Sequence, residues 1–149
     1  MEASTILFGI YLFLAVFNAG NMVTLHFQHY GIYKFVGETS FKNYMQANNK
    51  SALIPSILPA MLLLLFSIIL LFLRPMFMSQ TEAVTALLLN LIAFFSTFKW
   101  QRKLQAEMAE TGFDMNKINK LIATNILRTS AFLIQAVLAV YIAIINLKQ

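Results

Sequence analysis

The chain lacks cysteine entirely and has few acidic residues. None of its 149 residues is cysteine, which excludes a disulfide framework, a thiol nucleophile, an Fe–S cluster and a cysteine zinc site. The six acidic residues lie near the ends of apolar segments or in loops, at Glu2, Glu38, Glu82, Glu107, Glu110 and Asp114. The absence of a central carboxylate argues against a carboxylate-ligated metal centre within a helical bundle.

Charge of either sign is scarce, and apolar residues dominate. Charged residues make up 11% of the chain and hydrophobic residues 59%, with a mean hydropathy of +0.70. A soluble domain carries about 25% charge, so the composition predicts a single integral membrane domain over residues 1–149. The net charge is +5, but the basic residues do not form a nucleic-acid patch. We therefore expect the lipid bilayer, and no nucleic acid, as a partner.

Four apolar segments are long enough to cross a bilayer, for which about 20 helical residues suffice. Lipid offers the backbone no hydrogen-bond partners, and the segments lack the alternation of barrel strands, so they must be helical. The sequence thus predicts an all-α fold, an antiparallel bundle of four transmembrane helices. The expected helices cover about 5–30, 52–73, 81–111 and 114–147. The N-terminus has no basic n-region, so we interpret the first segment as a retained helix.

Local signals refine these boundaries. Pro55 and Pro59 predict a kink or a late start in the second helix. Ser79 and Glu82 form a capping-box pattern before the third helix. Gly112 is a suitable helix end, and Asp114 can cap the fourth helix. The stretch GETSFKNYMQANNKS predicts a short amphipathic surface helix, with three apolar residues toward lipid or protein: Phe41, Tyr44 and Met45.

Lys and Arg residues predict the orientation. The two loops on one side hold Lys34, Lys42, Lys50, Lys99, Arg102, Lys103, Lys117 and Lys120, whereas the other side holds Arg74 and Lys148. The positive-inside rule then places loops 31–51 and 101–117 in the cytoplasm. We expect a bacterial inner-membrane protein with both termini in the periplasm, whose third and fourth helices extend into the cytoplasm.

Polar side chains gather on one face of the first helix. At about 100° per residue, Asn18, Asn21 and His29 share this face, and Gln28 lies with them. His26 falls off the face. We therefore interpret His26 as an interfacial polar residue, and leave open whether His29 has a further role.

The fourth helix repeats the pattern. Asn125 and Arg128 share a face with Ala136, Ala139 and Ala143, small residues that let helices approach closely in lipid. A rise of about 1.5 Å per residue puts this pair at the depth of Asn18 and of Asn90 on the third helix. The predicted ligand-binding candidates are Asn18, Asn21, His29, Asn90, Asn125 and Arg128.

Arg128 is the only charged residue placed well inside an apolar segment. A central arginine costs about 2.5–3.5 kcal/mol on insertion scales, so it needs compensating partners. We predict that Arg128 hydrogen-bonds to the first helix or the first loop and closes the cytoplasmic end of the bundle. The alternative is that it binds an anionic or quinone-like ligand.

The two histidines, His26 and His29, are weak metal candidates. They have i, i+3 spacing, but no Glu-x-x-His motif accompanies them. Because they share one helix, they cannot ligate opposite faces of one haem within a single chain. We predict no metal site and no cofactor, while a quinone, a haem or a metal stays possible.

Two stretches resemble a known group of proteins. FQHYGIYKFVGETSFKNYMQANNK with IPSILPAMLL, and GFDMNKINKLIATNILRT, are similar to segments of small, uncharacterised bacterial four-helix membrane proteins, loosely related to anthrone oxygenases. Gly31 stands where that pattern has proline, and Ile126 where it has tryptophan. The matching positions are Gln28, Tyr30, Val36, Gly37, Phe41, Tyr44, Pro59, Met61, Gly112, Asp114, Asn125, Arg128 and Thr129.

Two functions remain in competition. The first is a non-catalytic structural or accessory subunit of a larger membrane assembly or a homo-oligomer, because no catalytic set is evident. The second is a membrane oxidoreductase or oxygenase that binds an aromatic or quinone-like molecule in a polar pocket of the cytoplasmic half. The resemblance and the inward-facing polar residues support the second, which is the alternative to the preferred first interpretation.

Overall fold

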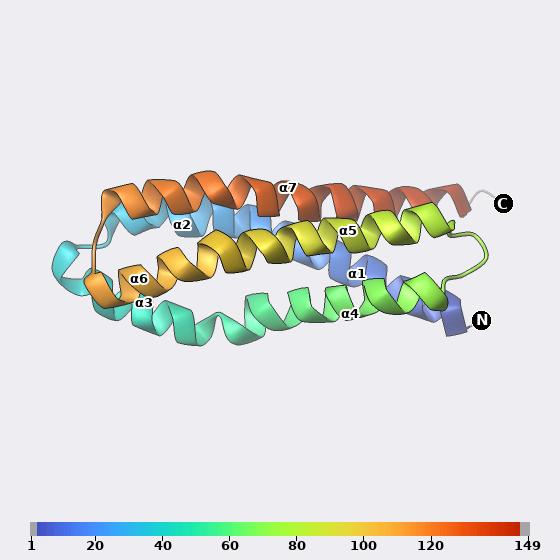
Figure 1. The fold of residues 1–149 in the computed structure, drawn as a ribbon, viewed down its shortest axis with the longest axis horizontal. Helices are drawn as coiled ribbons and strands as arrows, with labels where there is room; N and C mark the ends of the chain where they lie inside the picture. The colour runs from blue at the N-terminus through green and yellow to red at the C-terminus, as the bar shows by residue number, and fades with distance from the viewer. Residues whose placement is uncertain (1–2, 147–149) are drawn as a thin grey trace.

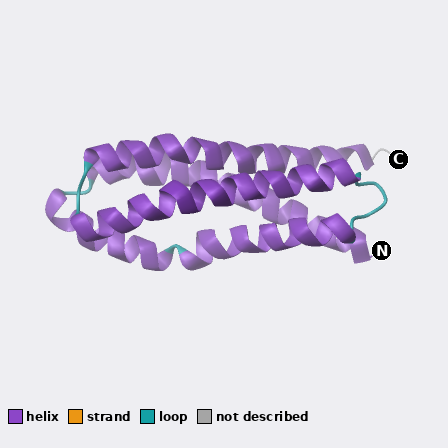
Figure 2. Cartoon of the chain, viewed as in Figure 1, coloured by secondary structure: helices purple, strands orange, loops and turns teal. Residues whose placement is uncertain are grey.

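The computed structural model describes residues 3–146, which are almost entirely helical and contain no strand (Figure 2). The predicted all-α fold class is therefore confirmed. Four of the helices are long and apolar enough to cross a membrane. They cover Ala3–Phe35, Leu53–Phe72, Gln80–Thr111 and Met115–Asn146.

Three of the four long helices contain a π-helical segment, and the first also ends in a 3₁₀ turn. The first comprises α1 (Ala3–Thr24), the π-helix η1 (Leu25–His29), α2 (Tyr30–Ile32) and the 3₁₀ turn η2 (Tyr33–Phe35). The second follows α3 (Glu38–Ser51) and comprises the π-helix η3 (Leu53–Ile57) and α4 (Leu58–Phe72). The third comprises α5 (Gln80–Ser96), the π-helix η4 (Thr97–Gln101) and α6 (Arg102–Thr111). The fourth is the uninterrupted α7 (Met115–Asn146).

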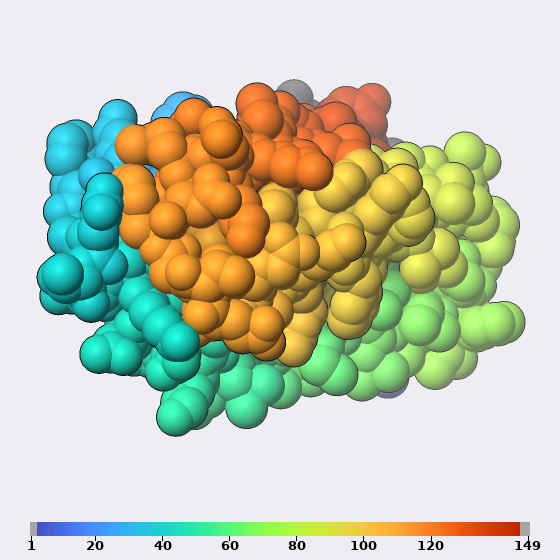
Figure 3. Space-filling model, turned by 60° about the vertical axis from the view of Figure 1, so that its left-hand side comes forward, coloured from blue at the N-terminus to red at the C-terminus, as the bar shows by residue number. Residues whose placement is uncertain are grey.

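The long helices lie side by side, and both ends of the described chain lie at the same end of the molecule (Figure 1). Helix α1 contacts α4 and α7, and α5 contacts the same two helices, so each long helix packs against two neighbours. At the opposite end α3 packs against α6 (Figure 3). The first helix continues to Phe35, beyond the predicted end near residue 30.

The predicted helix ends are confirmed in atomic detail. The Ser79 hydroxyl accepts a hydrogen bond from the Glu82 N–H at 3.2 Å, and the Glu82 carboxylate accepts one from the Ser79 N–H at 2.7 Å. Gly112 ends α6 with a φ of 90°, a conformation that favours glycine. The Asp114 carboxylate accepts from the N–H groups of residues 116 and 117, which caps α7.

The interior divides into two clusters. Between the long helices, buried alanines such as Ala15, Ala19 and Ala139 allow close helix approach. At the end formed by α3 and α6, the second cluster is mostly aromatic and long-chain residues: Tyr30, Tyr33, Phe41, Met45, Leu104, Met108, Ile118 and Leu121. The apolar side of α3 therefore faces protein.

Candidate functional site

Three π-helical segments line a single cavity. A π-helical turn is rare, and when it interrupts an α-helix it is often found at a functional site. Just after η3, Pro59 at the start of α4 has no N–H to donate to the carbonyl of Pro55. That freed carbonyl accepts from Asn21 Nδ2 at 2.8 Å. The lining residues from these segments are Leu25 and His29 of η1, Pro55, Ser56 and Ile57 of η3, and Thr97, Phe98 and Gln101 of η4.

The cavity has a volume of about 460 Å³, which falls in the range of small-molecule sites. Its lining is divided along the molecule. Toward the middle of the bundle it is mostly apolar, with Met22, Leu25, Ala60, Met61, Phe94 and Phe132, and it includes the polar residues Asn21 and Thr97. Toward the end formed by α3 and α6 it is polar, with His29, Asn48, Gln101, Arg102, Gln105 and Arg128. This division suits a ligand with an apolar body and a polar head.

Arg128 is buried in the wall of this cavity and is 8% exposed. Its Nε donates to Asn125 Oδ1 at 2.9 Å, and its Nη2 donates to the Tyr30 hydroxyl at 2.9 Å. The second bond confirms the predicted contact between Arg128 and the first helix. Both partners are neutral, and in residues 3–146 the single ion pair joins Lys117 and Glu107 elsewhere. The guanidinium charge is therefore buried without a carboxylate beside it.

Tyr30 connects two elements of the cavity wall. Its hydroxyl oxygen accepts from Arg128 Nη2 and also from Gln105 Nε2, at 3.1 Å. Both hydrogen bonds point to the phenol oxygen, which leaves its own O–H hydrogen available for a further acceptor. Tyr30 is 2% exposed, so these hydrogen bonds lie in the protein interior.

His29 lies in a polar group with Asn48 and Tyr33. Its Nε2 is 2.9 Å from Asn48 Oδ1, and Asn48 Nδ2 donates to the Tyr33 hydroxyl at 3.0 Å. Because the amide oxygen accepts only, the imidazole Nε2–H donates to Asn48 Oδ1. His29 therefore joins the end of the first long helix to α3.

His26 lies off the face that Asn21 and His29 share, as predicted. The structure turns it toward α7, where its Nδ1 lies 3.2 Å from Asn125 Nδ2. Gln28, expected on the inner face, is exposed instead. The cause is η1, because an i→i+5 turn departs from 100° per residue and rotates the residues within and after it. Beyond Thr24, the predicted face is kept at His29, which lines the cavity, but not at Gln28.

The six candidates do not form one cluster. Asn21, His29 and Arg128 line the cavity, whereas Asn18, Asn90 and Asn125 do not. Asn18 Nδ2 donates to the carbonyls of Leu14 and Pro59, and so ties α1 to α4. Asn125 holds Arg128 and His26 in place from behind the wall.

Asn90 belongs to a separate buried layer nearer the middle of the bundle. Its Nδ2 donates to the Ser67 hydroxyl at 2.6 Å, and Gln135 Nε2 lies 3.5 Å from the same oxygen. Gln135 also approaches the Tyr11 hydroxyl at 3.4 Å. These four fully buried residues come from four different helices, so the layer fixes how the helices align.

Sequence reasoning missed several residues of the site. Asn48, Gln101 and Gln105 were not singled out, because a lone amide near a helix end carries no recognisable signal. Gln101 is 1% exposed and donates to the Thr124 hydroxyl at 2.9 Å. The interruption of the helices near Pro55 was the one available hint, since proline disrupts the i→i+4 ladder.

Acidic side chains and metal-ligand clusters take no part in the site. Across residues 3–146 no three side chains of His, Cys, Asp or Glu gather as metal ligands would. Nearby on α3, burial raises the pKa of the Tyr44 phenol, so it stays neutral. Arg102 is exposed at the rim, so the one buried charge among the lining residues is the Arg128 guanidinium, and the arrangement can hold an anion or an electron-rich oxygen.

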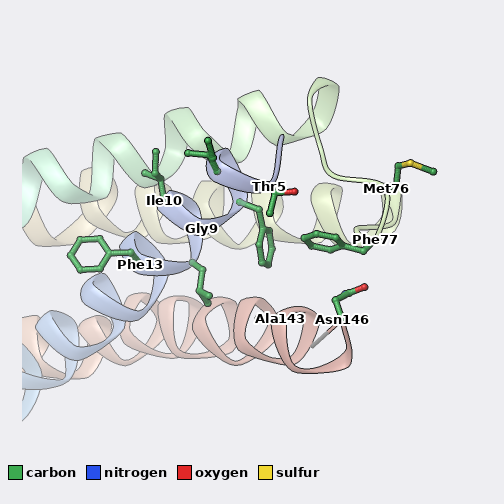
Figure 4. A pocket seen from close by; sticks show the side chains of 11 residues that line it. Thr5, Gly9, Ile10, Phe13, Met76, Phe77, Ala143 and Asn146 are labelled. Atoms are coloured by element: carbon green, nitrogen blue, oxygen red, sulfur yellow. The ribbon is translucent and has the colours of Figure 1, made fainter. Parts of the chain in front are cut away.

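A second hollow lies at the opposite end of the molecule. It is an open groove of about 1070 Å³ between α1, the turn after α4, and the end of α7 (Figure 4). Its lining is nearly all apolar, with Ile10, Phe13 and Phe77 among the side chains around it. No charged side chain lines it in the part of the chain that the structure describes. Its polar side chains among the described residues are Thr5 and Asn146, which are neutral, so the Arg128 cavity is the stronger candidate for a ligand with an anionic head.

The chain was compared with protein-family models, curated proteins and solved structures. None of the three comparisons gave a match. The candidate site is therefore defined by the geometry of the Arg128 cavity.

Proposed function

We propose that this chain is an integral membrane protein that binds one small amphipathic molecule in the Arg128 cavity. The ligand has an aromatic or quinone-like body and a head with an anionic or electron-rich oxygen. The body lies against Phe94 and Phe132, and the head lies near Arg128 and Tyr30. The carrying observation is that a buried, uncompensated guanidinium lines a cavity of ligand size.

The physical basis is the cost of burying a charge. A buried ion is expensive unless it is paired, and Arg128 has two neutral hydrogen-bond partners. A guanidinium has five N–H donors in a planar fork, so donors beyond these two remain for a ligand. An anionic head would complete the pairing that the chain leaves incomplete.

The proposal includes the orientation of the chain in a bacterial inner membrane. The four long helices cross the bilayer in antiparallel order, and the end carrying α3 and α6 lies in the cytoplasm. The basic residues at that end support this orientation under the positive-inside rule. The polar part of the cavity then lies near the cytoplasmic headgroups and its apolar part in hydrocarbon.

Ligand binding is favoured over a purely accessory role by the cavity itself. A subunit that only fills space in an assembly has no need for a buried arginine beside an internal cavity. Catalysis by an oxidoreductase or oxygenase, which the resemblance implies, would use the same cavity. An oxidoreductase reaction and an oxygenase reaction would both require that the molecule first bind in this cavity.

Cysteine labelling tests the orientation in this cysteine-free chain. We expect Lys42→Cys on α3 and Lys103→Cys on α6 to react with a membrane-impermeant maleimide only from the cytoplasmic side. Arg74→Cys, in the turn after α4, should react only from the periplasmic side. Labelling of either lysine position from the periplasm in intact spheroplasts would contradict the orientation.

Fluorescence of Trp100, the only tryptophan, tests binding. It directly precedes Gln101 in the cavity wall. We expect naphthoate and naphthoquinone to quench this fluorescence saturably in lipid nanodiscs, with one site per chain. Arg128→Leu should weaken naphthoate binding by about 30-fold or more, the cost of losing one partner of a buried charge pair.

Arg74→Leu is the matched control, because it removes the same charge at the opposite end of the molecule. Its affinity for naphthoate should equal that of the unaltered chain. Non-saturable quenching by both probes, or equal affinity of a folded Arg128→Leu variant, would refute the proposed function.

A further inference from the structure

Two large apolar residues of the cavity wall are also exposed on the outside of the long helices. Met61 on α4 is 54% exposed and Phe98 on η4 is 63% exposed, yet both line the cavity. A side chain that borders both a cavity and the outer surface marks an opening between them. In a membrane that surface contacts lipid.

The two residues lie at similar depth on consecutive long helices. The hydrogen bond of 2.6 Å from Asn90 Nδ2 to Ser67 Oγ sets the alignment of α5 against α4. Met61 lies about 9 Å from Ser67 along the helix axis, and Phe98 about 12 Å from Asn90, in the same direction. They therefore flank one gap between two neighbouring helices.

The helices beside this gap are irregular on both sides. On one side lies η3, where Pro55 and Pro59 interrupt the hydrogen-bond ladder. On the other side lies η4, a π-helical turn. Interrupted helices bend at less cost than regular ones, so a gap placed here can widen without disturbing the buried layer around Asn90.

From these observations we infer that the ligand enters and leaves sideways, from the cytoplasmic leaflet, through a portal between α4 and η4 flanked by Met61 and Phe98. This inference rests on the proposed function. The ligand is consequently a membrane-dissolved amphiphile. Its head moves at headgroup depth toward Arg128, and its apolar body stays in a hydrocarbon-like environment throughout. A ligand that came from the cytoplasm would instead pass the polar rim near Ser51 and Arg102.

Blocking the portal tests the inference. Met61→Cys is reacted with a benzyl methanethiosulfonate, and naphthoquinone binding from nanodisc lipid is followed by stopped-flow quenching of Trp100. We expect association and dissociation to slow by about tenfold or more, within the range over which access changes association rates. Reduction of the mixed disulfide should restore both rates.

Two matched positions serve as controls. Leu65→Cys lies one turn further along α4, is 49% exposed and does not line the cavity, so its modification should leave both rates unchanged. Ser51→Cys places the same benzyl group at the polar rim and should also have little effect. Unchanged rates after modification at Met61, or slowing at Ser51 alone, would overturn the lateral route.

Failure of this inference is distinguishable from failure of the proposed function. If quenching is saturable and depends on Arg128, but modification at Met61 leaves the association and dissociation rates unchanged, the portal is refuted and the binding site is not. Absence of saturable quenching in the unmodified chain refutes the binding site and the portal together.

Discussion

Phe41→Ala should lower the free energy of unfolding by about 3–5 kcal/mol, the cost of removing a buried phenylalanine. The Phe41 side chain is fully buried where α3 meets the rest of the molecule. Its ring packs edge-on against Phe113 at 5.3 Å and against Tyr33 at 6.0 Å between ring centroids. The loss should appear in SDS unfolding titrations and as faster hydrogen exchange in α3.

Phe35→Ala is the control for this prediction. It makes the same chemical change at a side chain that is 76% exposed, so it removes little packing. Its cost should stay below about 1 kcal/mol. Equal destabilisation by the two variants would mean that α3 is not held by the aromatic cluster.

Asn125→Leu should cost about 3 kcal/mol, because it breaks hydrogen bonds to a buried charge and to a histidine together. Asn125 is fully buried and accepts from Arg128 Nε while its own amide group approaches His26 and Thr129. Leucine has a similar size but leaves the Arg128 Nε–H and His26 Nδ1 without partners. Naphthoate affinity should fall as well, since the guanidinium loses the support that orients it.

Asn119→Leu provides the comparison on the same helix, where the side chain is exposed. Its unfolding free energy should change by less than about 0.5 kcal/mol, as for most surface substitutions. If Asn125→Leu were equally harmless, Asn125 would not be positioning Arg128.

The helical fold could be predicted because the sequence features that specify it, apolar runs and capping residues, are visible in short stretches of sequence or in its composition. Long apolar runs predict the long helices, and the Ser79–Glu82 pair and Gly112 predict two boundaries within a residue. The π-helical segments were not predictable beyond the disturbance at Pro55 and Pro59. Neither η1 nor η4 contains a proline, so their π-helical conformation depends on packing and on hydrogen bonds between helices.

The site was predictable only in part, for the same reason. Arg128 stood out as a buried charge, and its contact with the first helix was predicted from the cost of leaving it unpaired. Gln28 was misplaced because ideal geometry does not continue through η1. Tyr30 and Asn48 gained their roles through contacts across 98 and 19 residues of chain, which no short pattern in the sequence contains.

Native mass spectrometry of the gently purified chain tests the central claim most directly. We predict that the unaltered chain retains one small molecule, lighter than a two-chain phospholipid. Arg128→Leu should lose this molecule while remaining folded, and Arg74→Leu should keep it. A chain that carries no small molecule, or one that Arg128→Leu retains to the same extent, would contradict a ligand site built on Arg128.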